Sequence, residues 1–310
     1  MPNSIIFKKK INDFNSIITV TGDKSISIRW VLFASLANGI STAKNILVSE
    51  DVIAAIDAVK KLGLKVILKK NYCKIYGKGI EGYKYKKNIT INAQNSGTLG
   101  RLLTGFLINT PYPIKLIGDR SLSKRDFKRI SDPLNKFGAN IKLKDDKYLP
   151  LLIDKSSKLI PIKYYEKKGS AQCKSAVIFA GLRTNGTTII KAKKSRNHTE
   201  LMCKYLKLPI KIKKRRNYDD IKIQKAKNIN VLNYNIPSDI SSASFFIILT
   251  LLSKNSKLII KKVNVNKSRI GIISILNMMG AEIKLKKKKI YNGEEIADIH
   301  IRSKEKLNAI

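Results

Sequence analysis

The stretch that decides the fold is Thr21-Gly22-Asp23-Lys24-Ser25-Ile26-Ser27-Ile28-Arg29, followed by an apolar run at 30–37. An apolar segment leads into the glycine turn, and Lys24, Ser25 and Arg29 then lie at the start of a predicted helix. A helix start carries unsatisfied backbone N–H groups and partial positive charge. Ser25 and Arg29 are four residues apart, so they share a helix face. The stretch therefore predicts a site for a phosphate or carboxylate group.

The same kind of segment returns three more times along the chain. Serines at helix starts recur about every 71 to 74 residues, and helix-ending turns recur about every 71 to 75 residues. The serines are Ser25, Ser96, Ser170 and Ser241, and the turns are at Gly63, Gly138, Leu208-Pro209 and Gly280. A single basic helix start is more often a solvated surface feature. The recurrence, however, is an internal repeat, which favours a function shared by the helix starts.

Each repeat predicts a strand, a small-residue helix, a strand, an amphipathic helix and two further strands. The fold class is therefore α/β, built from βαβαββ modules. Ser49 is a predicted N-cap. After the opening helix, we expect helices at 52–62, 102–107, 130–137, 176–182, 199–206, 244–252 and 270–279. We expect strands at 42–47, 65–68, 72–77, 88–92, 114–117, 140–143, 187–191, 210–213, 258–261 and 282–285.

If the modules face one cleft, several helix dipoles converge on it and favour a multiply anionic ligand. Candidate donors are Lys24, Ser25, Arg29, Arg101, Arg125, the Ser170-Ala171-Gln172 turn and the Ser195-Arg196 pair. Guanidinium, ammonium and hydroxyl groups suit phosphate and carboxylate. Structural roles remain open for each: a capped turn at Asn95-Ser96-Gly97, an N-cap at Ser170, and an ordinary surface position for Arg125.

The formal net charge of +40 has two explanations. One is nucleic-acid binding. The other is a Lys-rich sequence in which Lys fills ordinary solvated positions. Lysines are spread along the whole chain and are not gathered on one arm. Single-strand binders require lysines interleaved with aromatic residues in one groove. The charge therefore indicates solvated lysines, which attract anionic small molecules and bind polyanions non-specifically at low salt.

Length and composition predict a globular protein of two domains, because the chain has 310 residues, of which 43% are hydrophobic. The longest apolar candidate, 245–252, is too short to span a bilayer. The first ten residues are charged and have no apolar core behind them, so no signal peptide is predicted and the cytoplasm is the expected location.

The cysteines and histidines predict no metal site. Cys73, Cys173 and Cys203 are scattered without a CxxC spacing and are expected to be reduced. His198 and His300 are far apart and lack partners at ligand spacing. We expect His198 to have a structural role, with Thr199-Glu200 capping a helix start. No GxSxG or P-loop motif is present.

Motifs from Thr21 to Ala281 resemble, in order, those of the 5-enolpyruvylshikimate-3-phosphate (EPSP) synthase family. They are the opening stretch with Gly39 and Asp51, Asn95-Ser96-Gly97-Thr98, Arg101-Leu102-Leu103, Leu122-Ser123-Lys124-Arg125, Ser170-Ala171-Gln172-Cys173-Lys174-Ser175-Ala176, Ser195-Arg196-Asn197-His198-Thr199-Glu200, Pro237-Ser238-Asp239-Ile240-Ser241-Ser242-Ala243 and Arg269-Ile270-Gly271. The sister UDP-N-acetylglucosamine enolpyruvyl transferases share the fold but have an opening motif without this Lys-Ser-x-Ser-x-Arg pattern.

The resemblance implies transfer of the enolpyruvyl group from phosphoenolpyruvate to the 5-hydroxyl of shikimate 3-phosphate, in chorismate and aromatic amino acid biosynthesis. It implies no metal or organic cofactor. By similarity, shikimate 3-phosphate is bound by Lys24, Ser25, Arg29, Ser170, Ala171, Gln172 and Ser195. By similarity, phosphoenolpyruvate is bound by Lys24, Gly97, Arg125 and Gln172. Lys24 is the catalytic residue implied in this chain, since it stabilises charge on the phosphate.

The implied fold has two domains of three modules each, the inside-out α/β barrels of enolpyruvyl transferases. Their crossovers fall near Val20 and near Asn235-Ile236. Residues 21–235 would be the complete domain on the shikimate 3-phosphate side. Residues 1–20 plus 236–310 would be a partial second domain with about one of three modules, because the repeat count is four.

The family continues beyond the point that matches Ile310, with a catalytic Asp in an acidic-Pro motif and a Lys-Glu-Ser-Asp-Arg-like run. We therefore expect turnover to need a separate polypeptide with those modules, or the chain to be an inactive remnant. A basic nucleic-acid-binding protein is the alternative from another class; specific nucleic-acid and membrane partners are not expected. Asp126 and Asn197 stand where the family more often has Pro and Asp. Asp126 is expected to weaken the hold of Arg125 on a carboxylate.

Overall fold

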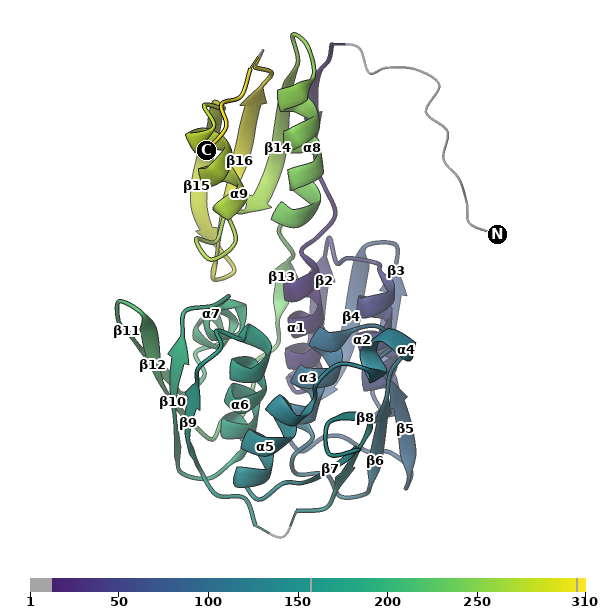
Figure 1. Ribbon diagram of the computed structural model, residues 1–310. Coiled ribbons are helices and arrows are strands. Elements are labelled where there is room, and N and C mark those ends of the chain that lie inside the picture. The colour runs from purple at the N-terminus through teal and green to yellow at the C-terminus, as the bar shows by residue number, and fades with distance from the viewer. Residues whose placement is uncertain (1–12, 157, 305) are drawn as a thin grey trace. The chain divides into compact units, whose positions relative to one another are not determined.

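The computed structural model describes residues 13–156, 158–304 and 306–310. Two compact units are present (Figure 1). The first unit spans Gly22–Ile236, and the second unit combines the segment that ends at Thr21 with Pro237–Ile310. The described residues form four sheets of four strands each, which confirms the mixed α/β class. No helix in these residue ranges is both long and apolar enough to cross a membrane.

The first unit contains three modules. The first consists of α1 (Lys24–Ser35), β2 (Asn38–Lys44), α2 (Glu50–Lys61), β3 (Lys65–Lys69), β4 (Tyr72–Lys78) and the later strand β13 (Asn233–Asn235). The second consists of β5 (Ile89–Asn92), α3 (Gly97–Phe106), β6 (Ile114–Ile117), α4 (Arg120–Ser123), α5 (Lys128–Lys136), β7 (Asn140–Lys144) and β8 (Tyr148–Asp154). The third consists of β9 (Lys163–Glu166), α6 (Ala171–Arg183), β10 (Thr187–Lys193), α7 (His198–Tyr205), β11 (Ile210–Lys214) and β12 (Tyr218–Gln224).

The second unit contains one sheet and two helices. Its elements are β1 (Asn15–Ile18), α8 (Ile240–Leu252), β14 (Lys257–Asn264), α9 (Gly271–Met278), β15 (Ile283–Tyr291) and β16 (Glu294–Arg302). The inner face of α8 is buried at Ile240, Ala243 and Ile247, whereas Phe245 is 77% exposed. Only one side of this apolar helix is therefore covered within its own unit.

All four sheets share one topology, so each sequence repeat corresponds to one four-stranded sheet. Their orders are β13-β2-β4-β3, β5-β6-β8-β7, β9-β10-β12-β11 and β1-β14-β16-β15. In each sheet, the first strand pairs in parallel with the second, and the remaining pairings are antiparallel. In two sheets the first strand comes from a distant part of the chain, since Asn233 of β13 pairs with Thr42 and Asn15 of β1 pairs with Lys257.

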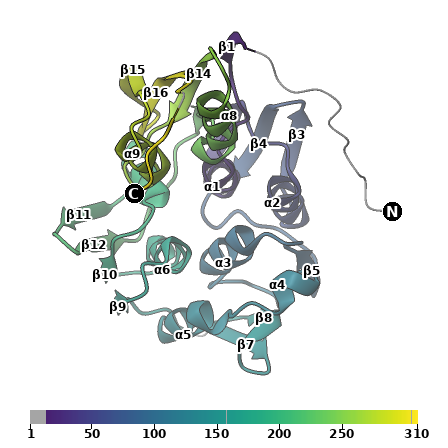
Figure 2. The same cartoon turned by 45° about the horizontal axis from the view of Figure 1, so that its top comes forward.

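The core of the first unit is the packing of α1, α3 and α6 on one another. Figure 2 shows these helices side by side, nearly along their axes, with the sheets outside them. Phe33, Phe106 and Phe179, one from each of these helices, meet at the centre. The rings of Phe106 and Phe179 stack with centroids 3.9 Å apart, and Phe33 contacts Phe179 edge-on at 5.2 Å. These helices are thereby buried along most of their lengths.

Three of the four turns that end the amphipathic helices require glycine, as expected. Gly63, Gly138 and Gly280 have φ values of 90°, 93° and 88°, in the left-handed region that glycine adopts at least cost. The third repeat has no glycine there, and Lys207, with φ of 54°, takes the left-handed conformation instead.

Several predicted elements differ from the observed ones. The helices α3, α6 and α8 begin about one turn earlier than expected, because their small polar residues form the first turn itself. Strands β1, β8, β9, β12, β13 and β16 occupy positions that the repeat pattern predicts but for which no residue range was expected, and the short helix α4 was not expected. Ser49 occupies the N-cap position of α2, which confirms that prediction, although its side chain makes no capping hydrogen bond.

The close approach of α3 and α6 gives a test of the core. A Cβ atom on Gly105 would lie 2.3 Å from the carbonyl oxygen of Ala176, which is backbone and cannot rotate away. We expect Gly105→Ala to lower the free energy of unfolding by roughly 1–3 kcal/mol, measured by urea denaturation.

The matched control is Gly271→Ala at the start of α9, where nothing lies within 4 Å of the added Cβ. This variant should be neutral or more stable by up to about 1 kcal/mol. Equal effects of the two substitutions would contradict the proposed tightness of the α3–α6 contact.

Candidate anion-binding site

The start of α1 presents one accessible cation. Asp23 is the N-cap of α1, and its carboxylate accepts a hydrogen bond from the Ile26 N–H at 3.0 Å. The Lys24 side chain is 47% exposed, and its Nζ lies 3.3 Å from Oδ2 of Asp51 in the first turn of α2. Lys24 is therefore held beside the helix start while its ammonium remains accessible.

Arg29 is 3% exposed and ties three helix starts together. Its Nε donates to Oγ1 of Thr199 at 2.8 Å, and its Nη2 donates to Oγ of Ser175 at 3.3 Å. Its Nη1 donates to the Ser25 carbonyl at 2.9 Å. The hydroxyls of Ser175 and Thr199 are themselves 2.7 Å apart. The positive charge of α1 is thus fixed against α6 and α7, and all these partners are electrically neutral.

A buried ion pair lies next to this network. Lys174 of α6 and Glu200 of α7 are almost fully buried, with Nζ and Oε1 2.6 Å apart. Because a buried charge without a partner is very costly, this pair fixes α7 against α6. Thr199 and Glu200 were expected to cap α7, and that prediction was wrong: they bond to Arg29 and to Lys174 instead.

The starts of α3 and α6 are bridged by one amide side chain. The Gln172 Oε1 accepts from Nη1 of Arg101 at 2.6 Å, and its Nε2 donates to Oγ1 of Thr98 at 2.9 Å. Burial lowers the pKa of the Arg101 guanidinium, and the positive charges of Arg129 and Arg125 lower it further. Such a crowded cation gains from a neighbouring anion.

Gly97, the first residue of α3, lies against two guanidinium groups. A Cβ atom there would be 3.0 Å from Nη1 of Arg101 and 3.2 Å from Nη1 of Arg125. Arg125 is exposed, and its Nη2 donates to Oδ1 of Asn95 at 2.6 Å. The absence of a side chain at this position therefore lets both cations approach the helix start.

The side chains of Asp126 and Arg125 have different hydrogen-bond partners. The Asp126 carboxylate accepts from the Lys128 N–H at 2.9 Å, and Arg125 contacts Asn95 and Ser121 instead. The Asp126 carbonyl accepts a long hydrogen bond of 3.4 Å from Arg101. The expected weakening of the hold of Arg125 on a carboxylate stays a prediction.

Ser170 is the N-cap of α6, as one of the two interpretations of the sequence proposed. Its Oγ accepts from the Cys173 N–H at 3.2 Å, and its own N–H donates to Oε2 of Glu166 at 2.8 Å. Ala171, the first residue of α6, is partly accessible. Capping uses the hydroxyl oxygen as an acceptor, so it is compatible with donation of the hydroxyl proton to an anion.

Ser195 has an unusual side chain for a ligand-free site. It follows β10, and its Oγ is buried without any hydrogen-bond partner among the described residues. Buried hydroxyl groups normally have a partner, so an unpaired one calls for an explanation such as a missing ligand. The starts of α1, α3, α6 and α7 together with Ser195 and Arg125 are called the helix-start cluster below.

No metal site accompanies this cluster. Among the described residues, no three or more His, Cys, Asp or Glu side chains lie close enough to hold a metal ion. His198 is buried as the first residue of α7 and follows the N-cap Asn197, whose side chain makes no capping hydrogen bond.

The corresponding motif of the second unit forms its own network. Asp239 is the N-cap of α8, and its Oδ1 accepts from the Ser241 N–H at 2.8 Å. Arg269 lies 3.2 Å from the same carboxylate oxygen and donates to Oγ of Ser241 at 2.8 Å. The α8 start therefore also carries a fixed guanidinium group.

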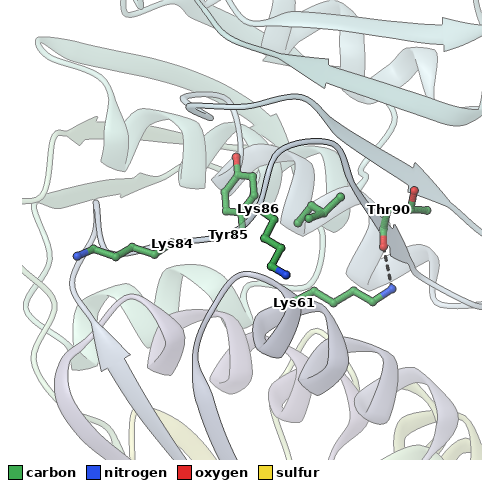
Figure 3. A pocket seen from close by; sticks show the side chains of 6 residues that line it. Lys61, Lys84, Tyr85, Lys86 and Thr90 are labelled. Carbon is green, nitrogen blue, oxygen red and sulfur yellow. Dashed lines mark hydrogen bonds between the residues drawn. The ribbon is translucent and has the colours of Figure 1, made fainter.

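A basic surface pocket of about 760 Å³ lies at the other end of α2 from the Lys24–Asp51 pair (Figure 3). Lys61, Lys84, Tyr85, Lys86 and Thr90 line it, and Nζ of Lys61 donates to the Thr90 carbonyl at 2.8 Å. The pocket contains no residue of the helix-start cluster.

Comparisons with known proteins agree on one family. Residues 8–308 match the family model of EPSP synthase (3-phosphoshikimate 1-carboxyvinyltransferase). A 3-phosphoshikimate 1-carboxyvinyltransferase of Leuconostoc mesenteroides is 38% identical over 297 residues, which are 96% of this chain and 67% of that protein. One from Caldicellulosiruptor bescii is 40% identical over 93% of this chain and 66% of its own length.

A solved structure of EPSP synthase from Acinetobacter baumannii superposes with a TM-score of 0.87 at 34% identity, covering 96% of this chain and 66% of that one. The repeated-module fold expected from the sequence is thereby confirmed. The chain spans about two thirds of the length of these relatives.

The cysteine at the start of α6 gives a test of the local environment. Burial raises the pKa values of Cys173 and Cys203 and raises that of Cys73 to about 12. A raised pKa keeps a thiol protonated at pH 8, and the protonated form is unreactive. We expect native protein to react with a disulfide reagent at least about 100-fold more slowly than a free thiol of pKa about 8.5.

The control is the same reaction in denaturant, where all three thiols should react at the rate of a free thiol. A fast-reacting thiol in the native protein would show that the first turn of α6 or one of the two other sites is open to solvent.

Proposed function

Because this chain belongs to the EPSP synthase family, we propose that it acts on phosphoenolpyruvate and shikimate 3-phosphate as a 3-phosphoshikimate 1-carboxyvinyltransferase. The products are 5-enolpyruvylshikimate 3-phosphate and phosphate, in aromatic amino acid biosynthesis. The proposal invokes no metal or organic cofactor. It places the reaction in the cytoplasm, as expected from the sequence.

The observation that best supports the proposal is the helix-start cluster with its unpaired Ser195 hydroxyl. Shikimate 3-phosphate carries a phosphate and a carboxylate, and these groups match helix starts with cationic and hydroxyl donors. We assign its binding to Lys24, Ser25, Arg29, Ser170, Ala171, Gln172 and Ser195. Arg29 acts from a buried position, where its charge is poorly screened.

The binding of phosphoenolpyruvate is assigned to Lys24, Gly97, Arg125 and Gln172. The guanidinium groups beside Gly97 and the start of α3 supply positive charge for its carboxylate. Arg125 is exposed and can turn from Asn95 to a ligand, whereas Gln172 is fixed by Arg101 and Thr98. The Arg125 side chain can thus adjust to the ligand, whereas the Gln172 side chain has a fixed position.

The reaction proceeds by addition and elimination. The 5-hydroxyl oxygen bonds to C2 of phosphoenolpyruvate and loses its proton, while C3 gains a proton and a tetrahedral intermediate forms. C3 then loses a proton, the double bond re-forms and the bond from C2 to the phosphate oxygen breaks. In the proposal, Lys24 and the start of α1 stabilise the negative charge that develops on the departing phosphate.

Ser195 provides the sharpest test of the binding assignment. Removing a hydrogen bond to a charged ligand costs roughly 1.5–3 kcal/mol, so Ser195→Ala should weaken shikimate 3-phosphate binding roughly ten- to a hundredfold. Titration calorimetry measures this affinity. Stability should stay within about 0.5 kcal/mol, since the hydroxyl has no protein partner to lose.

Thr188→Val is the matched control, because Oγ1 of Thr188 is also buried and unpaired but belongs to the inner face of β10. It should leave the affinity unchanged. If both variants bind shikimate 3-phosphate as tightly as the original chain, Ser195 does not contact the ligand.

Release of phosphate from a mixture of both substrates tests the reaction itself. Phosphate release that requires shikimate 3-phosphate supports the transfer. Binding of shikimate 3-phosphate without phosphate release contradicts transfer by this chain alone, agrees with the expected need for a separate polypeptide, and leaves the binding assignment standing. No heat of binding with shikimate 3-phosphate contradicts both parts.

A further inference from the structure

The sheet of the third module has one face covered by helices and one open face. α6 and α7 lie on the inner side of the β11-β12-β10-β9 sheet (Figures 1 and 2). Ile190, Ile221 and Ile223 are buried on that inner side. Because side chains alternate along a strand, the residues next to them project from the opposite face. That face is called the β9–β12 face below.

The β9–β12 face carries a concentration of positive charge. Its lysines are Lys163, Lys191, Lys193, Lys211, Lys213 and Lys222. Cross-strand register places Lys211 opposite Lys222, so their charges are neighbours. Asp220 is the acidic residue that these strands contribute to the face, and its Oδ2 lies 3.1 Å from Nε of Arg215. None of the six lysines takes part in an ion pair within the described residues.

Two tyrosines lie among these lysines. Nζ of Lys191 is 5.4 Å from the ring centroid of Tyr165 and 4.2 Å from that of Tyr218. Lys167, just after β9, lies 5.7 Å from the Tyr165 centroid. The Tyr165 side chain is 52% exposed, so part of its ring is open to solvent. The face therefore combines ammonium groups with accessible aromatic surface.

This arrangement corrects one conclusion drawn from the sequence. The sequence favoured lysines that fill ordinary solvated positions, but on the β9–β12 face lysines are interleaved in space with tyrosines. Tyr165 and Lys191 are directly opposite each other on paired strands, and so are Lys193 and Tyr218. These residues are distant in sequence, and sheet pairing brings them together. A one-dimensional pattern has no means of showing this.

We propose that the β9–β12 face binds single-stranded nucleic acid without sequence preference. Ammonium groups neutralise the phosphates, and exposed tyrosine rings stack with unpaired bases. A duplex keeps its bases stacked on one another, so it would use the lysines alone. This function is additional to enolpyruvyl transfer and uses no residue that we assign to substrate binding.

The test measures fluorescence anisotropy of labelled twelve-nucleotide oligo(dT) and oligo(U) with the full chain over a range of salt concentrations. Contacts to about five or six phosphates give a slope of log affinity against log salt of about −4. Replacing Lys211, Lys213 and Lys222 by Gln should reduce the magnitude of this slope by about 2 and weaken binding at low salt at least about tenfold.

The matched control replaces Lys115, Lys142 and Lys144 by Gln. These lysines belong to the β5-β6-β8-β7 sheet, and the control removes the same charge. We expect it to change the affinity less than about threefold. Equal losses in the two triple variants would overturn the proposal, because binding would then follow the general positive charge of the chain.

Tyr165→Ala tests the stacking. It should weaken oligonucleotide binding by roughly five- to a hundredfold with an unchanged salt slope, and Tyr165→Phe should restore the affinity. Long-chain polyphosphate has no bases, so its affinity should be the same for the original chain, Tyr165→Ala and Tyr165→Phe. If Tyr165→Ala weakens neither ligand, the stacking is absent and the proposal fails.

A further measurement uses binding to vesicles of phosphatidylcholine and phosphatidylserine. Tighter binding to these vesicles than to the oligonucleotides, abolished by the Lys211, Lys213 and Lys222 substitutions, would assign the face to anionic membranes and overturn the proposal. Shikimate 3-phosphate binding should be unchanged in every variant, so failure here is separable from failure of the proposed enzyme function.

Discussion

The mutual burial of α1, α3 and α6 is the contact on which the first unit depends. These three helices pack on one another at Phe33, Phe106 and Phe179, and their sheets lie outside them. The centre is aromatic, and the polar residues that are available to ligands lie at the helix starts and on the outer sheet faces. Both candidate binding surfaces follow from this division, because one uses the helix starts and the other an outer face.

The helix-start cluster holds its cations mainly by neutral groups. Arg29 bonds to hydroxyls and a carbonyl, and Arg101 bonds to an amide and a carbonyl. Neutral partners fix the position of a guanidinium without cancelling its charge. Lys24 has an acidic partner, Asp51, but this pair is accessible and therefore weakly coupled. The field at the helix starts is consequently available to an anion, and the site is organised before a ligand arrives.

Sequence reasoning succeeded where the determinants are local. The serine spacing, the left-handed Gly63 turn and the polar first turns follow from neighbouring residues, and they were enough to predict the modules. It failed where partners come from different helices. Neither the Lys174–Glu200 pair nor the Thr199 contact with Arg29 has a signal at short spacing. No residue range was predicted for strands such as β12, whose outer positions are polar. Their apolar residues are too few to indicate a strand from the sequence alone.

The origin of β13 has a consequence for how the protein is made. Thr42 and Asn233 bond to each other although 191 residues separate them, and the indole of the deeply buried Trp30 donates to the Leu232 carbonyl. At ribosomal speeds of 5–20 residues per second, β2 waits for roughly 10–40 s before the strand that covers its edge has been synthesised. An uncovered edge can pair with other chains. The order of strands along the chain therefore leaves the edge of β2 open to pairing with other chains during translation. In the folded unit β13 covers this edge.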